Sequence, residues 1–298
     1  MRERVPSGLA LSLETQQLIH RIETFCQEPH LTARQTTLPF LDLCNIKATE
    51  METANRWIHL YSVAFRAFGP QGWWPARMPF EVIVGAVLAQ HTAWRNAEQG
   101  LGRLRAARAL TPAGMASLPP ARLARLIRPA GTYRAKARTL RAFLAALKRD
   151  FGGSLRRLLE EPAPTLRPWL LAIPGIGPET ADCILLYAAG SPTFVADAYA
   201  RRILARHGLV PFGIPYEAVR GEALAHLPPD AALQGELHAL LVAVGKQFCR
   251  TRPRCAACPL APDLPNGTPL TPPVLGRRPA AYGPPPPPPS IGAEPWPT

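Results

Sequence analysis

The nine residues from Ile173 to Ala181, IPGIGPETA, have the composition of a sharp turn between two helices. Glycine leaves the backbone N–H groups of the turn unobstructed, and Pro178 suits the first position of the helix that follows. Backbone N–H groups at the start of a helix bind a phosphate group without the help of a side chain. An ordinary corner between two helices is the alternative. We predict a phosphate-binding hairpin with the Ile176 side chain in its core and these contact residues: Gly175, Ile176, Gly177 and Thr180.

Three of the six cysteines, Cys249, Cys255 and Cys258, lie within ten residues of one another. Six cysteines are few for a chain of 298 residues, so we do not expect a disulfide framework. Thiolates at such close spacing can ligate a metal ion or an iron–sulfur cluster. The segment is therefore a candidate metal or cluster loop.

The charge of the chain indicates a polyanionic partner. The formal net charge is +13, and no acidic residue lies between Glu98 and Asp150. A solvated helix face usually carries both signs of charge, whereas a basic surface without acids is typical of nucleic-acid binding. We expect nucleic acid to be the partner, with a solvated basic face as the alternative. The basic residues of this stretch include Arg103, Arg105, Arg108, Arg122, Arg125, Arg128, Arg134, Lys136, Arg138 and Arg141.

The elements that must position these residues are helices. Residues 79–90 are apolar and long enough for a buried helix. Apolar residues recur at three- and four-residue spacing in the segments 92–107, 119–127, 133–151 and 237–249. Proline and glycine residues separate the segments, and the alternation typical of strands is missing. The sequence predicts an all-α protein.

The two ends of the chain differ from the middle. Residues 1–50 are an expected N-terminal extension, and the proline-rich residues 266–298 are an expected disordered tail because they can form no packed core. The domain is expected at residues 51–265. The N-terminus lacks the apolar run of a signal peptide, and no segment is long and apolar enough for a membrane-spanning helix. We expect a cytoplasmic protein associated with the nucleoid.

The hairpin and the residues that follow it resemble a known family. With Val195 to Tyr199, VADAY, the hairpin resembles the helix-hairpin-helix and following aspartate of the endonuclease III superfamily of DNA glycosylases, the HhH-GPD proteins. Residues 80–94 resemble the family helix that ends in a glutamine facing DNA, and residues 131–137, GTYRAKA, resemble its Gly-x-Tyr-x-x-Lys-Ala segment. The resemblance covers residues 51–264 and implies a two-lobed helical fold with a DNA-binding cleft between the lobes.

The resemblance also implies contacts with DNA outside the hairpin. Gln90 would fill the gap that remains when the target nucleotide flips out of the duplex, and an exposed helix end is its alternative role. Lys136 and Lys246 would contact phosphate groups, and pairing with an acidic residue is their alternative role.

The resemblance implies that Asp197 is catalytic. Cleavage of an N-glycosidic bond builds positive charge on the sugar, and a carboxylate beside the anomeric carbon, or one that activates a water there, lowers the barrier. Asp197 is the only carboxylate between Asp182 and Glu217. Its other role, as the N-cap of the following helix, is compatible with catalysis.

Bifunctional members of the family carry a lysine in the hairpin, whose amine attacks the sugar and drives strand cleavage through a Schiff base. This sequence has Glu179 at the matching position. A carboxylate cannot form a Schiff base, and glutamate suits the first turn of a helix. We therefore expect base release without strand cleavage.

The segments 72–75 and 90–94 most resemble the branch of the family related to 3-methyladenine DNA glycosylase. An alkylated purine is cationic, leaves readily and stacks on electron-rich rings, so this resemblance implies an alkylated base as the substrate. Each aromatic residue has the alternative role of packing in the core. The candidates for the base pocket are Trp73, Trp74, Trp94 and Tyr133.

The cysteine segment resembles the iron–sulfur loop of the family, which implies a [4Fe–4S] cluster held by Cys249, Cys255 and Cys258. The fourth cysteine of the family would fall at Leu264. The remaining iron would be ligated by solvent, by Asp263, by a distant cysteine or by nothing. Structural zinc and a metal-free loop are the alternatives.

The sequence predicts a monofunctional DNA glycosylase of base-excision repair that acts as a monomer on double-stranded DNA containing a damaged base. No membrane partner is expected. One alternative is a glycosylase for mismatched adenine or thymine. The other is a DNA-binding or lesion-sensing protein without turnover.

Overall fold

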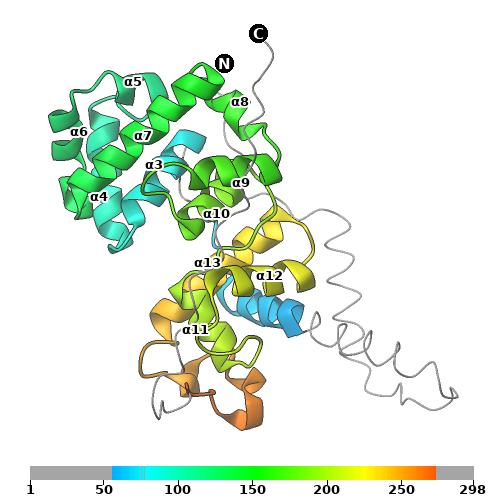
Figure 1. Cartoon of the computed structure of the whole chain (residues 1–298). Coiled ribbons are helices and arrows are strands. Elements are labelled where there is room, and N and C mark those ends of the chain that lie inside the picture. Colours follow the sequence, from blue (N-terminus) through cyan, green and yellow to red (C-terminus); the bar gives the residue numbers. More distant parts are fainter. Residues whose placement is uncertain (1–55, 75, 77, 273–298) are drawn as a thin grey trace, which may run out of the picture.

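The computed structural model describes residues 56–74, 76 and 78–272. Every regular element among these residues is a helix, as the sequence predicts (Figure 1). None of the described helices is both long and apolar enough to cross a membrane. The expected extension at residues 1–50 and most of the expected tail at residues 266–298 lie outside the described residues.

The helices form two lobes, and the first lobe, in cyan and green in Figure 1, contains α3 to α10. It contains one 3-10 turn, η1 (Arg128–Ala130), between α6 and α7. Its helices are α3 (Pro79–Ala89), α4 (Trp94–Ala106), α5 (Pro112–Ala116), α6 (Pro120–Leu126), α7 (Tyr133–Phe151), α8 (Leu155–Leu159), α9 (Ala163–Leu171) and α10 (Pro178–Tyr187).

The second lobe is formed by chain segments from both sides of the first lobe. Its helices are the one at residues 56–68, α11 (Ala198–Arg206), α12 (Tyr216–His226) and α13 (Ala231–Gln247). Three 3-10 turns follow α13: η2 (Cys255–Ala257), η3 (Ala261–Asp263) and η4 (Pro265–Gly267). Within the described residues, the chain thus passes from the second lobe to the first and back again.

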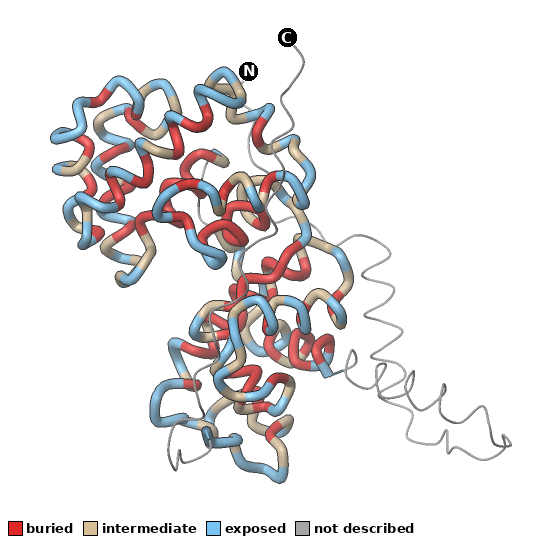
Figure 2. The backbone as a smooth tube through the Cα atoms, viewed as in Figure 1, coloured by how far each residue is buried: buried red, intermediate tan, exposed pale blue. Residues whose placement is uncertain are grey.

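Each lobe buries its own apolar core (Figure 2). In the first core, Ile83 of α3, Leu104 of α4 and Phe143 of α7 are fully buried. In the second, Trp57 packs edge-on against Phe194, with their ring centroids 5.9 Å apart. Burial of these large apolar side chains is the main term that stabilises each lobe.

The α7 helix shows how the sequence sets the bounds of an element. The segment predicted at residues 133–151 coincides with the helix. Leu140, Phe143 and Leu147 recur at three- and four-residue spacing and are buried, so one face of the helix is apolar. The helix ends at Gly152, whose φ of +65° lies in the left-handed region that glycine adopts without a steric penalty.

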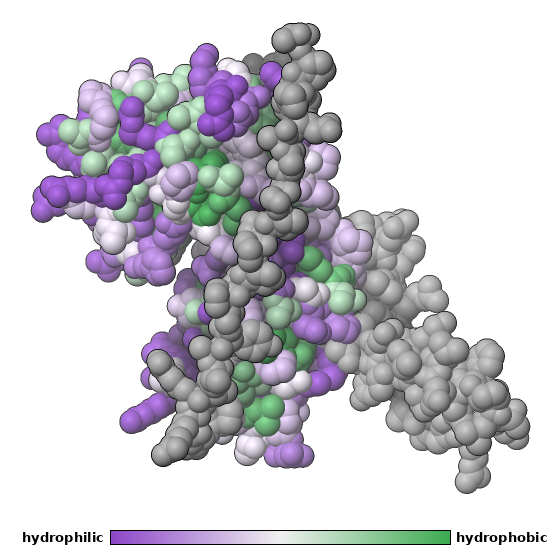
Figure 3. All heavy atoms as spheres, viewed as in Figure 1, coloured by the Kyte–Doolittle hydropathy of each residue, from purple (hydrophilic) through white to green (hydrophobic). Residues whose placement is uncertain are grey.

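Exposed basic side chains cover the first lobe. All of the arginines that the sequence places in the acid-free stretch from 99 to 149 are exposed, whereas Lys136 is buried. Figure 3 shows hydrophilic side chains gathered over the outer side of the lobe that holds α4, α6 and α7. This lobe therefore presents a positively charged surface, as the prediction of a polyanionic partner requires.

A buried carboxylate joins the two lobes. Asp182 of α10 is fully buried and accepts hydrogen bonds on both oxygens from Arg167 of α9, at 2.9 and 3.0 Å. From α12, Tyr216 donates its hydroxyl to the same carboxylate at 2.9 Å, and Arg220 donates Nε at 3.2 Å. Thr193, in the segment that connects the lobes, donates at 3.1 Å.

The charge of Asp182 is balanced by this network. A buried carboxylate is stable only when it is paired with cations and hydrogen bonded, and both conditions are met. The hydrogen bond to Asp182 raises the pKa of the Arg167 guanidinium above its usual value. Burial, and next the charge of Asp182, raise the pKa of the Tyr216 hydroxyl, so this group stays protonated and donates.

We predict that Asp182→Asn lowers the free energy of unfolding by about 3–5 kcal/mol, because it removes the charge that compensates two partly buried guanidinium groups. Urea unfolding followed by circular dichroism measures this change. Glu160→Gln is the control, because Glu160 pairs with Arg156 on the exposed surface and its loss should change stability by less than about 0.5 kcal/mol. Similar small effects of both substitutions would contradict the role given to Asp182.

Candidate functional site

The hairpin predicted at residues 173–181 joins α9 to α10. The first hydrogen bond of α10 runs from the Ala181 amide to the Gly177 carbonyl, at 2.9 Å. Within the described structure, the amides of Gly177, Glu179 and Thr180 donate to no protein atom. Free amides at the positive end of a helix dipole can bind an anion such as a phosphate group.

Ile176 has a packing role in this hairpin. Its side chain is buried in the core of the first lobe, as the sequence predicts. Its amide donates to the Ile173 carbonyl at 3.0 Å and is therefore not free to bind a phosphate. The structure thus gives Ile176 a structural contact in place of the expected contact with DNA.

The two glycines of the hairpin are required for different reasons. Gly175 has a φ of +91°, and a Cβ at this position would overlap the Thr139 hydroxyl of α7. Gly177 has a φ of −95°, and a Cβ there would meet no protein atom within 4 Å. Gly175 therefore permits the hairpin to pack on α7, whereas Gly177 leaves the start of α10 open to a ligand.

Gln90 connects the end of α3 to the hairpin. Its side-chain amide donates to the Gly175 carbonyl and to the Thr180 hydroxyl, both at 2.9 Å. The Thr180 side chain is buried, so its backbone amide is the group that remains for the predicted contact with DNA. Both hydrogen bonds would have to break before Gln90 could enter a duplex, and its gap-filling role stays a prediction.

The Lys136 side chain does not reach the protein surface. The residue is buried, and its Nζ donates to the carbonyls of Leu88 at 2.9 Å, Gln90 at 2.7 Å and Ala130 at 2.7 Å. Burial lowers the pKa of this ammonium group from its usual value. The three carbonyls use all three N–H donors, so the expected contact between Lys136 and a phosphate is wrong. The lysine instead fixes the end of α3 against η1.

Asp197 begins α11 and has one free carboxylate oxygen. Oδ1 accepts a hydrogen bond from the Ala200 amide at 2.7 Å, which confirms the N-cap. Among the described residues, Oδ2 accepts no hydrogen bond, and it lies 3.8 Å from Nε2 of His238, with 15% of the Asp197 side chain exposed. The cap holds the carboxylate in place while Oδ2 remains available to a ligand.

His238 of α13 is a site residue that sequence reasoning missed. Its ring is buried, Nδ1 lies 2.7 Å from the Tyr187 hydroxyl, and Nε2 has no hydrogen-bond partner among the described residues. The same hydroxyl lies 3.0 Å from the Gly235 carbonyl. Nothing in the pattern of α13 distinguishes His238 from a histidine of an ordinary core helix.

The tautomer of His238 follows from these contacts. If Tyr187 donates to Nδ1, then Nε2 carries the proton and directs it toward the Asp197 carboxylate. If Tyr187 donates only to Gly235, a neutral His238 directs a lone pair toward that carboxylate, which is repulsive. The first arrangement leaves the Gly235 carbonyl without the Tyr187 proton, but we assign it because it alone places an N–H group beside the free oxygen of Asp197.

Three of the predicted pocket residues lie in contact. The ring centroid of Trp74 is 5.5 Å from that of Trp73 and 5.2 Å from that of Trp94, and Trp73 and Trp94 are 5.6 Å apart. Tyr187 extends this aromatic cluster, since its ring lies 5.5 Å from Trp74. Because Tyr187 also contacts His238, the aromatic cluster is connected to the surroundings of Asp197.

Among the described residues, the Tyr133 ring makes no contact with this aromatic cluster, whereas the Lys246 ammonium group does. Tyr133 begins α7, packs on the core of the first lobe and has the Arg134 guanidinium 5.8 Å from its ring centroid. Its expected place in a base pocket is therefore not supported by its contacts. The exposed Lys246 places Nζ 5.6 Å from the centroid of Trp73, so this ring already receives a cation on its electron-rich face.

Glu179 lies near Asp197 at the start of α10. Partial burial, and next the charge of Asp197, raise the pKa of Glu179 above its usual value. His238, Arg201 and His91 act in the opposite direction. The hairpin thus presents a carboxylate in place of an amine on the side that faces Asp197.

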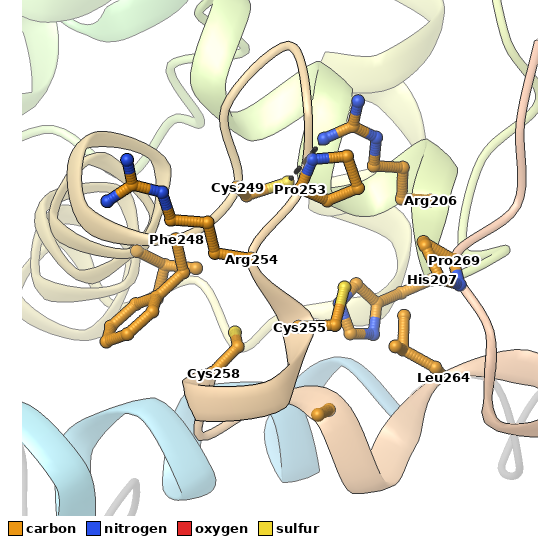
Figure 4. Close-up of a pocket in the computed structure, with 12 residues that line it drawn as sticks. Arg206, His207, Phe248, Cys249, Pro253, Arg254, Cys255, Cys258, Leu264 and Pro269 are labelled. Atoms are coloured by element: carbon orange, nitrogen blue, oxygen red, sulfur yellow. Dashed lines mark hydrogen bonds between the residues drawn. The ribbon is translucent and has the colours of Figure 1, made fainter.

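The three cysteines of the predicted cluster loop line one pocket of the second lobe (Figure 4). Leu264, at the position expected for a fourth cysteine, lines the same pocket. In the part of the chain that the structure describes, no three side chains of His, Cys, Asp or Glu are close enough together to hold a metal ion as they stand. The three cysteines are Cys249, Cys255 and Cys258.

Comparison with known proteins decides the family. Residues 84–229 match the HhH-GPD superfamily of base-excision DNA repair proteins. A protein of Methanocaldococcus jannaschii, which its name assigns provisionally as a DNA repair glycosylase, is 37% identical over 207 residues, covering 67% of this chain and 92% of the relative. The chain belongs to the HhH-GPD superfamily.

Two further HhH-GPD proteins are similar to this chain. Endonuclease III of Thermotoga maritima is 32% identical over 181 residues, which cover 60% of this chain and 79% of the relative. The solved 3-methyladenine DNA glycosylase of H. pylori, bound to 1,N6-ethenoadenine, is 27% identical with a TM-score of 0.55, covering 65% of this chain and 97% of that one. These relatives confirm the predicted all-α fold and the class of DNA glycosylase in base-excision repair.

The HhH-GPD match contains only part of the candidate site. The hairpin and Asp197 lie inside residues 84–229. Trp73, Trp74, His238 and the cysteine segment lie outside them. The aromatic cluster therefore combines Trp94 and Tyr187 of the matched region with Trp73 and Trp74 from outside it.

We predict that substitution by alanine distinguishes the roles of the two hairpin glycines. Gly175→Ala should lower the free energy of unfolding by about 2 kcal/mol or more, because the new methyl group combines a positive φ with an overlap at Thr139. Gly177→Ala should change stability by less than about 1 kcal/mol and weaken duplex binding about tenfold, because its methyl group projects toward the anion site.

Urea unfolding and fluorescence anisotropy with a labelled duplex at one fixed salt concentration measure the two effects. Unchanged affinity in Gly177→Ala would show that the start of α10 does not bind the DNA backbone.

Proposed function

We propose that this HhH-GPD protein is a monofunctional DNA glycosylase that removes an alkylated purine from duplex DNA and leaves an abasic site. The observation that carries the proposal is the continuous contact from the aromatic cluster through Tyr187 and His238 to Asp197. A set of aromatic rings suited to stacking on an electron-poor base is thereby connected to a carboxylate suited to a cationic sugar.

The DNA backbone would be held by the hairpin and by the first lobe. The free amides at the start of α10 supply a neutral but directional phosphate site, and the exposed arginines supply sequence-independent attraction. Neither feature distinguishes one base from another. Both therefore suit an enzyme that must search undamaged DNA before a nucleotide flips.

The base would be recognised by its positive charge and by stacking of its flat face on an aromatic ring. An alkylated purine carries a positive charge that an indole ring attracts, and Trp73 already has the Lys246 ammonium group over its ring. A cationic base would take the place of this ammonium group at the same face. The similarity to the H. pylori 3-methyladenine DNA glycosylase supports this substrate class.

Asp197 would act on the sugar. As the bond between C1′ and the base nitrogen breaks, the base leaves with the electron pair and positive charge develops on the sugar ring. Oδ2 of Asp197, which has no other hydrogen bond among the described residues, stabilises this charge and orients a water toward C1′. The water adds its oxygen to C1′ and gives up a proton to the Asp197 carboxylate, which passes it to solvent, while the cationic alkylated base leaves as a neutral molecule.

Strand cleavage would be absent because the hairpin offers no nucleophilic amine. Glu179 lies where bifunctional relatives have lysine, and a carboxylate forms no Schiff base. Lys136 is buried with its three donors in use, so it cannot replace that lysine. Lys246 is the one amine of the predicted site that is exposed near the aromatic cluster.

The test is to incubate the protein with a duplex containing 3-methyladenine and to follow base release and strand nicking separately. We expect base release without nicking and no covalent adduct after borohydride reduction. Asp197→Asn should slow release at least about 100-fold, because it removes the charge that stabilises the sugar cation. Its binding to undamaged duplex should be unchanged.

Three results would contradict the proposal. A borohydride-trapped adduct that disappears in Lys246→Met would make Lys246 a lyase amine. Release of adenine or thymine from mismatched duplexes, with none from methylated DNA, would change the substrate class. Binding to DNA without release of any base would leave a lesion-binding protein.

We predict that His238 positions Asp197. His238→Ala should lower the rate of base release about tenfold, because it removes an N–H group 3.8 Å from the charged Asp197 oxygen, and leave duplex affinity unchanged. His238→Gln should restore part of the rate, because its amide can donate toward Asp197. Tyr187→Phe should lower the rate less than His238→Ala does. It removes the hydroxyl that selects the His238 tautomer but leaves the His238 ring in place.

Single-turnover rates and dissociation constants of the three variants separate these effects. Equal losses in His238→Ala and His238→Gln, together with weaker DNA binding, would indicate a packing role only.

A further inference from the structure

The cysteine pocket has a fourth candidate ligand that comes from outside the loop. His207, the C-cap of α11, lines this pocket together with Cys249, Cys255 and Cys258. Figure 4 shows the four side chains around the pocket. His207 lies 42 residues before the first of these cysteines, so the sequence of the loop gives no indication of it.

The imidazole of His207 is buried and has a nitrogen available to bind a metal. The residue is 5% exposed, and its Nδ1 has no hydrogen-bond partner within the part of the chain that the structure describes. The ligand nitrogen of a metal-binding histidine likewise carries no competing hydrogen bond. A buried nitrogen without a partner is otherwise unfavourable.

We propose that His207 is the fourth ligand of a [4Fe–4S] cluster, bound through Nδ1, with Cys249, Cys255 and Cys258 as the other three. The residue at the expected fourth position, Leu264, is buried in the wall of the same pocket and supplies no ligand. Imidazole replaces thiolate on iron in other iron–sulfur centres, so the donor set is chemically sound. This inference does not depend on which base the enzyme removes.

The surroundings of Cys249 also suit an anionic centre. Arg206 of α11 donates Nη1 to the Cys249 sulfur at 3.2 Å, and Arg202 donates Nε to the Cys249 carbonyl at 2.7 Å. Hydrogen bonds and positive charge near thiolate ligands stabilise a cluster and tune its potential. The helix that supplies His207 thus also supplies the cations.

The spacing favours a cluster over zinc. The two residues between Cys255 and Cys258 are also usual in structural zinc sites, but the five residues between Cys249 and Cys255 exceed the usual two to four. The four side chains line the pocket but lie farther apart than the ligands of one metal ion. Among the described residues, no three His, Cys, Asp or Glu side chains are grouped closely enough to bind such an ion. Cluster binding therefore requires the cysteine side chains to rotate toward the centre of the pocket.

The experiment is to purify the full chain under anaerobic conditions and to measure iron, acid-labile sulfide and zinc per chain. We expect about four irons and four sulfides, with the visible absorption of a [4Fe–4S] cluster. His207→Ala should retain about three irons and show the electron paramagnetic resonance signal of an oxidised three-iron cluster, because one iron loses its protein ligand.

His207→Cys keeps the test informative if His207→Ala does not fold. This variant should hold four irons and have a lower reduction potential than the natural protein, because thiolate stabilises the oxidised state more than imidazole does. His59→Ala is the matched control, since His59 contacts the Asp263 side chain and does not line the pocket. Its cluster should be unchanged.

Several results would overturn the proposal. Zinc in place of iron, or neither metal, in the natural protein would show that the pocket holds no cluster. Equal iron content and identical spectra in the natural protein and His207→Ala would show that His207 is not a ligand. An unchanged reduction potential in His207→Cys would show the same.

Discussion

The charge of Asp182 is the constraint on which the arrangement of this protein depends. A fully buried carboxylate must be matched by donors, and the donors come from α9, from α12 and from the segment between the lobes. Apolar packing alone would stabilise each lobe without fixing one relative to the other. The requirement to satisfy one buried charge therefore sets the relative position of the lobes, and Asp197 lies only four residues after Thr193 of this network.

The same principle acts at smaller scale around the hairpin. Lys136 satisfies three carbonyls at the end of α3, and Gln90 donates to two oxygens of the hairpin. The hydrogen bonds of Lys136 and Gln90 thus connect α3, α7 and α10 and leave the amides at the start of α10 free. Among the described residues, the hairpin amides and Oδ2 of Asp197 make no hydrogen bond of their own, and the proposed reaction uses both.

Much of this could be predicted from local sequence. Periodicity gave the bounds of α7, glycine and proline gave the hairpin, and Asp197 was expected to cap α11. Residues whose role depends on contacts between distant segments could not be predicted. His238 and His207 look like ordinary helix residues until the fold brings Tyr187 or the cysteines to them, and Lys136 looked like a surface cation because its three acceptors are not encoded nearby.

The double passage of the chain between the lobes has a mechanical consequence. Within the described residues, the connections at 69–78 and 188–197 both run between the lobes, so neither lobe can rotate freely about a single strand of backbone. Bending is then confined to an axis through the two connections. Points on an axis of rotation move least, and Trp73, Trp74 and Asp197 all lie on these connections. Flexing of the lobes around a duplex would leave the distance between the stacking rings and the carboxylate nearly constant.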